Sequence, residues 1–316
     1  MNTFGRNFRV QVFGESHGEA IGVVVDGVKA GIPLCKDDFV EDILRRKSGA
    51  KGTTPRIEAD EPEILSGVFE GHTTGAPNAI IFRNNNTRSS DYDLLKEVPR
   101  PGHADFTASV KFDGFNDPRG GGHFSGRMTL PLVAAGVIAK KQCGFSFNAS
   151  LKEIGGETDC SKWDSLLESV AAEGDSIGGV VECCIEGVPA GFGDPFFDSV
   201  ESLLSHAVFA IPGVRGIEFG DGFSASRMKG SEHNDCLPLK KNGAGGINGG
   251  ITNGAPIVFR VAFKPTSSIR KEQQTLNVKT GEKVSLVVPG RHDVCFALRT
   301  PVIVEAVAAI VLADLI

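Results

Sequence analysis

Alternation of apolar and polar residues marks the beginning of the chain. Residues 8–13 (FRVQVF) alternate with a period of two, and residues 21–27 (IGVVVDG) form a run rich in β-branched side chains. Both patterns predict β-strands. The segment GESHG at 14–18 is therefore expected in a loop that joins two strands.

This loop matches G-x-S-x-G, the pattern around the nucleophilic serine of many hydrolases. Such a serine sits on a sharp turn that leads from a strand into a helix. Here a strand is expected on both sides of the loop. The context argues against Ser16 as an acyl-enzyme nucleophile.

Further elements follow from the same patterns. Residues 37–47 predict a helix with Asp37 or Asp38 as its cap and with one apolar face formed by Phe39, Val40, Ile43 and Leu44. Helices are also expected at 127–141 and 164–174, and as a buried closing helix at 302–316. Strands are expected at 63–71 and 78–83 as a pair, at 176–187, at 256–263, and as a hairpin over 275–288 that turns at TGEK.

An internal repeat links the two halves of the chain. Residues 25–44 align with residues 185–204 at a constant offset of 160, and eight of the twenty positions are identical. The offset suggests two copies of a strand–loop–helix unit that pack together. No Pro- or Ser-rich linker separates the copies, so we expect one domain over 1–316, with halves of roughly 1–160 and 161–316.

Composition narrows the class of protein. The net charge of -6 gives no global basic field that would draw the chain to nucleic acid or membrane. Seven cysteines, with no CxxC pair, indicate free thiols in a reducing compartment. The first residues have no apolar signal-peptide core, and the apolar stretch at 302–316 is too short to span a bilayer. We expect a cytoplasmic protein.

Glycine is the unusual component. The chain has 40 glycines, and they cluster at 120–122 and 243–250. Glycine allows tight turns and also close approach of the backbone to a ligand. Composition alone leaves these two roles open.

Four segments combine residues suited to an anionic ligand. RPGHADF (100–106) places His103 beside Arg100 and Asp105, and DPRGGGHFSGR (117–127) leads through glycines to the start of a helix. KPTSS (264–268) offers a lysine and hydroxyls, and GRHDVC (290–295) offers an arginine, a histidine and an aspartate. Together they suit a polyanion with a phosphate leaving group, for which histidine is a natural acid near neutral pH.

Other templates do not fit. The chain has no GxxxxGK[ST] loop, and GAGGING lacks the spacing and the βαβ context of a dinucleotide site. His292 and Cys295 have a spacing that metal ligands use, but no second pair accompanies them. We expect no metal site.

These motifs, taken in order, resemble the chorismate synthase family. GESHGEAIGVVVDG, GGGHFSGRMTLPLVAAGVIA and RHDVCFALRTPVIVEA are similar to its three signatures, and the resemblance runs from about residue 4 to residue 315. It implies an α+β fold, a β-α-β sandwich with an internal pseudo-two-fold repeat, in a homotetramer. It also implies a 1,4-anti-elimination of phosphate and a proton from 5-enolpyruvylshikimate 3-phosphate, dependent on reduced FMN, with NADPH as a candidate reductant.

The resemblance assigns roles to single residues. His17 would protonate the reduced flavin, His103 would protonate the departing phosphate, and Asp293 with Ser16 and Ser125 would relay a proton. Anions of the substrate would bind to Arg46, Arg100, Arg127 and Arg291, and NADPH would bind at Arg46 and Lys51. The implied FMN contacts are His123, Phe124, Ser125, Pro212, Gly213, Gly249, Lys264, Pro265, Thr266, Ser267, Ser268 and Arg291.

Three departures from the family pattern accompany this resemblance. His123-Phe124 stands where an Arg-Ser pair is usual, Lys51 stands where an arginine is usual, and Pro212-Gly213 replaces an Asn-Ala pair. These changes predict weaker binding of FMN. The alternatives are a non-catalytic homologue that binds flavin or a phosphosugar, and a phosphatase-like enzyme or lyase acting on another substrate.

Overall fold

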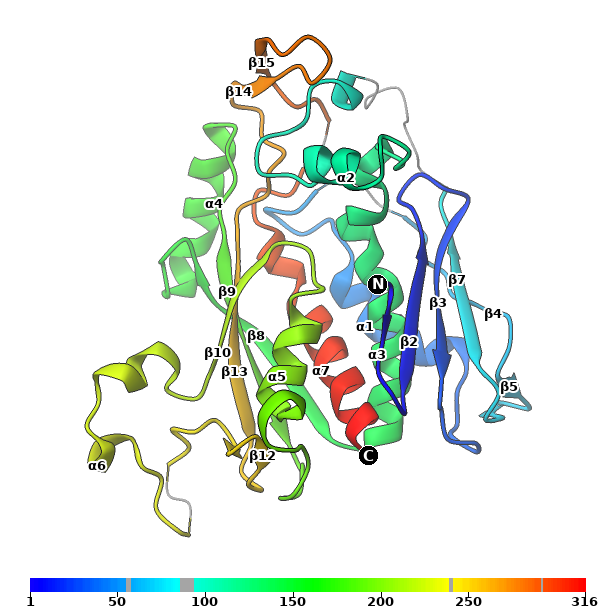
Figure 1. Cartoon of the computed structure of the whole chain (residues 1–316), viewed down its shortest axis with the longest axis vertical. Coiled ribbons are helices and arrows are strands. Elements are labelled where there is room, and N and C mark those ends of the chain that lie inside the picture. The colour runs from blue at the N-terminus through cyan, green and yellow to red at the C-terminus, as the bar shows by residue number, and fades with distance from the viewer. Residues whose placement is uncertain (55–57, 86–93, 239–240, 291) are drawn as a thin grey trace.

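The computed structural model describes residues 1–54, 58–85, 94–238, 241–290 and 292–316. Two antiparallel sheets form its sides (Figure 1). The first sheet has the order β1 (Thr3–Phe4), β2 (Arg9–Gly14), β3 (Ala20–Asp26), β7 (Asn78–Arg83) and β4 (Glu63–Ile64). The second has the order β10 (Val214–Phe219), β13 (Ile257–Phe263), β9 (Gly179–Glu186) and β8 (Ser146–Ile154).

Two long helices fill the space between the sheets. Helix α3 (Thr129–Cys143) packs on β3 and β7 of the first sheet, and α7 (Pro301–Leu315) packs on β8 and β9 of the second. The two helices also pack on each other, so the chain forms three layers (Figure 1). This arrangement buries the apolar segment at 302–316, as the sequence predicts. The mixture of antiparallel sheets and helices confirms the α+β class.

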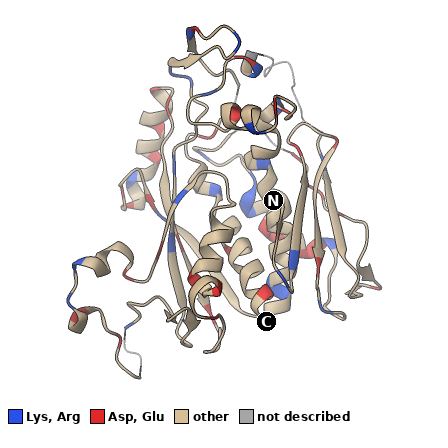
Figure 2. Cartoon of the chain, in the orientation of Figure 1, with Lys and Arg blue, Asp and Glu red and all other residues tan. Residues whose placement is uncertain are grey.

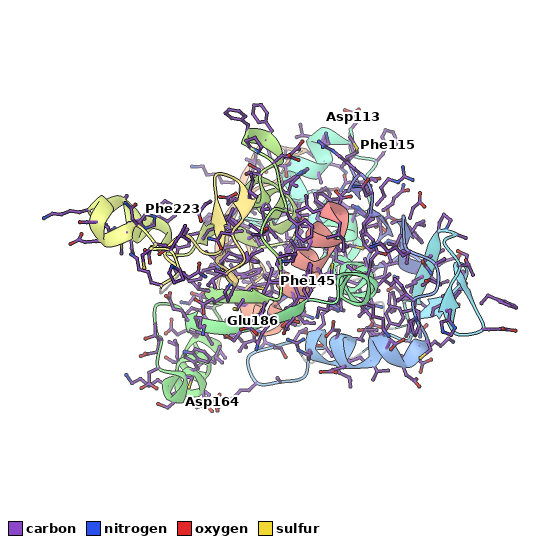
Figure 3. All side chains as sticks on the ribbon, turned by 90° about the horizontal axis from the view of Figure 1, so that it is seen from below. Asp113, Phe115, Phe145, Asp164, Glu186 and Phe223 are labelled. Carbon is purple, nitrogen blue, oxygen red and sulfur yellow. The ribbon has the colours of Figure 1, made fainter. Side chains whose placement is uncertain are left out.

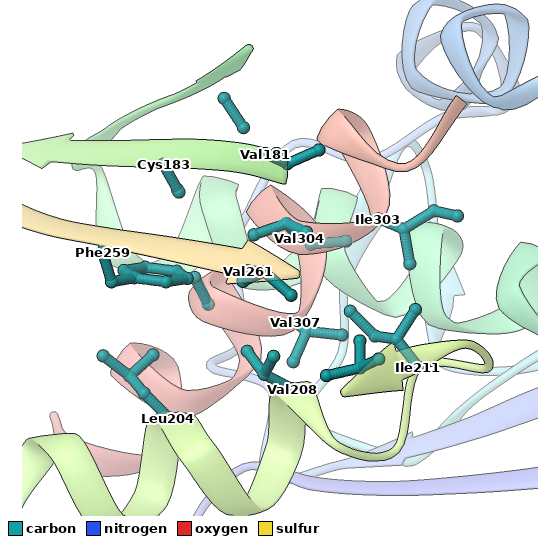
Figure 4. Close-up of a cluster of buried hydrophobic side chains, with 14 of the residues drawn as sticks. Val181, Cys183, Leu204, Val208, Ile211, Phe259, Val261, Ile303, Val304 and Val307 are labelled. Carbon is teal, nitrogen blue, oxygen red and sulfur yellow. The ribbon is translucent and has the colours of Figure 1, made fainter. Parts of the chain in front are cut away.

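Alternating residues build the core on the second sheet. The burial of β13 alternates along its whole length, so that Phe259 and Val261 face inward. They meet Val304 and Val307 of α7 and the buried face of α5 (Val200–Val208), as Figure 4 shows. A period of two in the sequence therefore identifies the face that the helices cover.

The remaining elements lie around these layers. They are α1 (Val40–Arg46), α2 (Asp105–Lys111), α4 (Trp163–Ala172), α6 (Gly230–His233), and the hairpins β5 (Val68–Phe69) with β6 (His72–Thr73), β11 (Ile247–Asn248) with β12 (Ile251–Thr252), and β14 (Gln273–Leu276) with β15 (Lys283–Leu286). None of the helices in the described parts of the chain combines the length and the apolar character needed to cross a membrane.

The helix expected at 37–47 differs from the prediction in two respects. Residues 36–39 form a 3₁₀ turn before α1, and the carboxylate of Asp38 accepts a hydrogen bond from the backbone N–H of Cys35. The apolar face is only half covered, because Phe39 and Ile43 are buried whereas Val40 and Leu44 are 48% and 57% exposed. A short helix at the edge of the layers contacts its neighbours along a narrow line.

The strand pair expected at 63–71 and 78–83 is also partly wrong. Only Glu63 and Ile64 pair with β7, and Val68–Phe69 pairs instead with His72–Thr73. The chain reverses between them at Glu70 and Gly71, both of which have positive φ angles. This local turn removes the second part of the segment from the main sheet.

The two segments of the sequence repeat form matching local structures. Gly31 N–H donates to the carbonyl of Thr73, and Gly191 N–H donates to the carbonyl of Thr252. The hydroxyls of Thr73 and Thr252 in turn donate to the carbonyls of Lys29 and Pro189, at 2.6 and 2.7 Å. Each copy thus leads from a central strand, through a turn tied to a threonine, into a helix that packs on one of the two long helices, α1 on α3 and α5 on α7.

Candidate active site

A cavity of about 1020 Å³ opens between the two sheets beneath α2. Its described lining contains seven basic residues against three acidic ones, in contrast to the acidic chain as a whole. The basic residues are Arg46, Lys47, Arg100, Arg127, Arg215, Lys264 and Arg299, and the acidic ones are Glu58, Asp60 and Asp293. In Figure 2, blue segments accordingly lie between the sheets in this region.

The triple glycine brings the two predicted histidines together. A Cβ atom on Gly120 would lie 2.7 Å from Nε2 of His17 and 2.9 Å from Oγ of Ser16. A Cβ atom on Gly121 would lie 3.4 Å from Nε2 of His103. Both glycines have positive φ angles, which disfavour a side chain, and at Gly120 the ring of His17 also leaves no room for one.

The GESHG loop is fixed against these glycines. The N–H of Ser16 donates to the carbonyl of Gly122, and Nδ1 of His123 lies 2.7 Å from the carbonyl oxygen of Gly14. Ser16 is buried, and its Oγ has no hydrogen-bond partner among the described residues. Because the loop joins strands β2 and β3, the hydrolase context is absent, as the sequence predicts.

His103 is held by two charged neighbours on its own segment. Its Nδ1 lies 2.6 Å from Oδ1 of Asp105 and 3.0 Å from Nη2 of Arg100. Arg100 itself forms a two-pronged pair with Asp105, at 2.7 and 2.8 Å. Burial would raise the pKa of the Asp105 carboxyl, but these hydrogen bonds keep that pKa well below its usual range.

The KPTSS segment closes over the same turn. Nη1 of Arg100 donates to Oγ of Ser268, and Nζ of Lys264 donates to the carbonyl of Gly102 at 2.9 Å. Burial lowers the pKa of Lys264, and the charge of Arg215 lowers it further. The second half of the chain thereby contributes lysine and hydroxyl groups to a cavity that is also lined by His103 of the first half, whereas His17 is not part of the lining.

Two buried arginines of the cavity lining share one carboxylate. Nη1 of Arg127 donates to Asp60 at 2.5 Å, and Nη2 of Arg46 lies 3.5 Å from the same carboxylate. Nε of Arg127 donates to Oδ1 of Asn84. Asp60 has a positive φ angle, a strained conformation for a residue other than glycine.

The arginines are not fully neutralised by these contacts. Nε of Arg46 and Nη2 of Arg127 are buried without a hydrogen-bond partner among the described residues. Burial lowers the pKa of Arg46 to about 9, Asp60 opposes this effect, and the like charges of Arg299 and Arg127 add to it. An anion placed here would relieve both the repulsion and the missing hydrogen bonds.

Asp293 also lines the cavity, and both of its carboxylate oxygens accept hydrogen bonds. Oδ1 accepts a hydrogen bond from the N–H of Thr54, and Oδ2 accepts one from Nη2 of Arg299 at 2.8 Å. The guanidinium of Arg299 also stacks over the ring of Phe296, 5.1 Å from its centre. The side chain of Asp293 is therefore held at a fixed position beside the cavity.

The flavin-contact positions implied by the resemblance divide into two groups. His123, Phe124, Ser125, Pro212, Gly213 and residues 264–268 line the cavity, and the lining also has an apolar side that includes Leu132, Ile211 and Ile310. Oγ1 of Thr266 is buried without a partner among the described residues, so one donor is available to a ligand. Gly249 is not part of the lining, because it lies in the β11–β12 turn.

Lys51 and Arg46 do not meet at one ligand position. Lys51 pairs with Glu168 and Asp164 of α4 and is not part of the cavity lining, whereas Arg46 is buried in the cavity wall. Arg291 lies outside the described residues. Ser125 lines the cavity, where its Oγ accepts a hydrogen bond from the N–H of Arg127. Within the described parts of the chain, no cluster of metal-ligating side chains occurs.

The sequence patterns do not single out Asp60, Asn84 or Arg299. Arg299 belongs to the segment RHDVCFALR, and its place in that motif could have identified it as a candidate site residue. Asp60 and Asn84 have no such signal, because they reach Arg127 only through the fold.

Comparisons with known proteins show which family the chain resembles. The family model for chorismate synthase matches residues 8–316. The chain is 62% identical to a chorismate synthase of Chitinophaga pinensis, over 99% of this chain and 96% of that protein. It is 45% identical to one of Dehalococcoides mccartyi, again over 99% and 96% of the two chains.

A solved structure agrees as well. A crystal structure of chorismate synthase superposes with a TM-score of 0.74 at 25% identity, and the match covers 99% of this chain and 92% of that one. The fold, the family model and the relatives therefore lead to one conclusion. The chain belongs to the chorismate synthase family.

Proposed function

We propose that this chain forms chorismate in the cavity between its two sheets, with 5-enolpyruvylshikimate 3-phosphate and reduced FMN bound together. As a member of its family, the chain is a carbon–oxygen lyase of the shikimate pathway of aromatic amino acid biosynthesis. The reaction breaks the C–O bond to phosphate and a C–H bond on the opposite face of the ring. One observation supports this proposal: His103, which lies at the glycine loop with His17 on its other side, lines the same cavity as two buried, incompletely paired arginines.

The substrate anions are proposed to bind to the basic wall. The substrate carries a phosphate and two carboxylates, and the unpartnered N–H groups of Arg46 and Arg127 are suited to such oxygens. Arg100 borders the same space, although most of its hydrogen bonds go to Asp105 and Ser268. Arg291 is also proposed to bind a substrate anion, and this proposal rests only on the resemblance to the family.

The histidines are proposed as separate acids. Nε2 of His103 would give its proton to an oxygen of the departing phosphate, whose electron pair comes from the broken C–O bond. His17 would hold its proton at the other side of the glycine loop. Asp293, Ser16 and Ser125 are proposed to carry the ring proton away, since a fixed carboxylate and two hydroxyls can accept and pass on a proton.

FMN is proposed to bind along the segment 264–268, the Pro212-Gly213 turn and the His123–Ser125 segment. These residues combine apolar surface with a buried hydroxyl and a lysine, a composition that suits a flavin with its phosphate. When bound in its reduced form, the cofactor supplies electron density to the ring and recovers it within the same turnover. NADPH is proposed as the reductant of the flavin, and Lys51 is proposed to contact it.

The assembly and symmetry implied by the family are proposed as well. The matching turns at Thr73 and Thr252 support a pseudo-two-fold relation between the halves. Exposed aromatic side chains such as Phe115, Phe197 and Phe223, which are 92%, 91% and 76% exposed, support association into a homotetramer. Figure 3 shows that Phe115 and Phe223 lie at the periphery. Light scattering of the purified protein measures the oligomeric state.

The test of the function is an anaerobic assay. Substoichiometric reduced FMN is supplied with excess substrate, and chorismate formed and flavin oxidised are both measured. We expect many turnovers per flavin, with the flavin still reduced at the end. Oxidation of one flavin per chorismate, or equal activity with oxidised FMN and no reductant, contradicts the proposal. Flavin binding without turnover would identify a non-catalytic homologue.

A further inference from the structure

The contacts around His103 carry an inference about Asp105, which rests on the proposed role of His103 as an acid. The ring has two nitrogens with different surroundings. Nδ1 faces Asp105 and Arg100, whereas the Cε1–Nε2 edge faces Gly121 of the glycine loop. Only Nε2 is therefore directed toward the region where the substrate is proposed to bind.

Nδ1 cannot hydrogen-bond to both of its neighbours at once. Nη2 of Arg100 can only donate, so it needs a lone pair on Nδ1, whereas the carboxylate of Asp105 needs a proton there. The contact to Asp105 is shorter, 2.6 Å against 3.0 Å, and a hydrogen bond to a carboxylate is the stronger of the two. Nη2 of Arg100 has another acceptor in Oδ1 of Asp105, at 2.8 Å.

We propose that Asp105 is a positioning residue that keeps a proton on Nδ1 of His103 and thereby reserves Nε2 for proton transfer to the leaving phosphate. The protonated ring carries N–H groups at both nitrogens. Loss of the Nε2 proton to a phosphate oxygen leaves a neutral ring whose Nδ1–H still donates to Asp105. Nε2 then has a lone pair that can accept the next proton. The ring therefore returns to its protonated state without rotating about its side-chain bonds.

The geometry of Asp105 fits this task. Its side chain is 8% exposed and accepts hydrogen bonds from the backbone N–H and the guanidinium of Arg100. It therefore cannot rotate away from the ring without breaking the pair with Arg100. Without the carboxylate, Nη2 of Arg100 is already within 3.0 Å of Nδ1 and would donate to it. The neutral ring would then carry its proton on Nε2.

A matched pair of variants separates positioning from support of the local structure. Asp117 makes the same set of contacts to Arg119, through the backbone N–H, Nε and Nη2, at 3.0, 2.9 and 2.8 Å, whereas Asp105 adds a contact to Nδ1 of His103. Asp117→Asn reports the cost of losing such a pair next to the glycine loop. Asp105→Asn loses the same kind of pair together with the contact to His103.

The kinetic experiment uses the full-length enzyme with reduced FMN. We expect Asp105→Asn to lower kcat about 10- to 10²-fold with little change in KM, less than the 10²–10⁴ typical for removal of the acid itself. Asp117→Asn should lower kcat much less. In a His103→Ala background, Asp105→Asn should cause no further loss, because the residue acts through the ring. Additive losses, or equal losses in the two aspartate variants, overturn the inference.

A second measurement needs neither substrate nor flavin. Nitrogen NMR of histidine-labelled protein, with the His103 signals assigned from His103→Gln, reports which ring nitrogen carries the proton. We expect Nδ1–H in the neutral ring of the wild type and Nε2–H in Asp105→Asn. The same tautomer in both proteins overturns the inference. The expected tautomers in a protein that forms no chorismate would refute the proposed function and leave the positioning by Asp105 intact.

Discussion

Buried guanidinium groups with unused N–H donors distinguish the cavity wall from the rest of the surface. Arg127 is the clearest case, because its side chain is 6% exposed and its Nη2 has no partner among the described residues. Asp60 and Asn84 fix the group but do not use all of its donors. A buried donor without a partner costs stability, so its retention at this position points to a ligand.

Replacement of Arg127 tests this interpretation. A hydrogen bond to a charged group contributes about 1.5–3 kcal/mol, so Arg127→Ala should weaken substrate binding roughly 10- to 10²-fold. Calorimetry with FMN present measures the affinity. Arg83→Ala is the control, because Arg83 forms an exposed pair with Glu63 outside the cavity lining. Equal affinities of the Arg127 variant and the wild type would make Arg127 a structural residue.

His17 gives a second prediction at this scale. Loss of a general acid costs about 10²- to 10⁴-fold in rate, so His17→Ala should lower kcat within that range while the protein stays folded. Gly120→Ala should also lower it, because the added methyl group would displace the ring of His17. His72→Ala serves as the control, since His72 lies exposed on β6 and contacts the carbonyl of Glu70. Near wild-type turnover of His17→Ala excludes His17 from the mechanism.

Contacts between elements depend on a few positions where helices approach closely. Gly136 of α3 faces α7, and a Cβ atom there would lie 2.3 Å from Cβ of Ala306 and 2.5 Å from its Cα. Such an approach excludes any larger residue in this helix pair. A glycine in the middle of a helix is otherwise unfavourable, so packing explains its presence.

Gly136→Ala should therefore destabilise the protein despite the better helix propensity of alanine. Overpacking of a core typically costs about 1–3 kcal/mol in the free energy of unfolding. Chemical denaturation followed by circular dichroism measures the change. Gly230→Ala in α6 is the matched control, because its new methyl group would meet no atom closer than 3.9 Å. A Gly136 variant as stable as the control would show that α3 and α7 can separate without cost.

Glu305 links four elements through charge. It is 1% exposed and accepts hydrogen bonds from Arg45 of α1, Lys140 of α3 and the N–H of Ala149 in β8. Burial would raise the pKa of Glu305, but the hydrogen bond from Arg45 and the charge of Lys140 hold it below its ordinary value. A carboxylate with a depressed pKa stabilises the fold above its unfolded pKa and loses that effect as the pH falls.

The lowered pKa of Glu305 predicts how stability changes with pH. The free energy of unfolding should fall as the pH drops below about 4.5, the ordinary value for glutamate, partly because Glu305 becomes protonated. Glu305→Gln should cost roughly 1.5–3 kcal/mol at neutral pH, since it removes charge-assisted hydrogen bonds from Arg45 and Lys140, which keep only Asp42 as a carboxylate partner. The variant should also show a weaker fall in stability at acidic pH. Denaturation midpoints measured from pH 3 to pH 7 provide the test. An unchanged fall in stability at acidic pH in Glu305→Gln would assign the pH dependence to other carboxylates.

The whole molecule is held together by contacts between the two halves of the chain. Asp314, near the end of α7, accepts hydrogen bonds from the backbone N–H groups of Arg6, Asn7 and Phe8. Helix α7 also packs between the second sheet and α3 of the first half. Neither sheet therefore has a complete core without the other half.

This arrangement predicts a single cooperative unfolding transition. Trp163, the only tryptophan, packs against the hydrophobic core of the second sheet, so its fluorescence reports on that half. In the double variant Trp163→Phe with Phe13→Trp, the fluorescence would report on strand β2 of the first sheet instead. We expect the denaturation midpoints of the two reporters to coincide, after correction for any difference in stability measured by circular dichroism. Two separated transitions would show that the halves fold as independent domains.

Periodic patterns explain why much of the fold is predictable. Strands β2, β3, β9 and β13 and helices α3 and α7 have long apolar patterns, and each is found close to the expected residues. The position of a short element depends on contacts with residues far away in the sequence or on a local turn, and an apolar pattern does not predict either. Val40 and Leu44 have helical spacing but no partner to cover them, and Val68–Phe69 pairs within its own hairpin.

The sequence by itself determined the family, the central strands and helices, and the motifs that carry the candidate chemistry, because these depend on local spacing and on uninterrupted signatures. Only the tertiary structure decided which of those motifs meet. It joined Asp60 and Asn84 to Arg127 across 67 and 43 residues, tied Asp293 to Arg299 and Thr54, and left Lys51 outside the cavity. The physical reason is that charge pairing in a buried cavity depends on distance and burial, and neither quantity is written in the order of the residues.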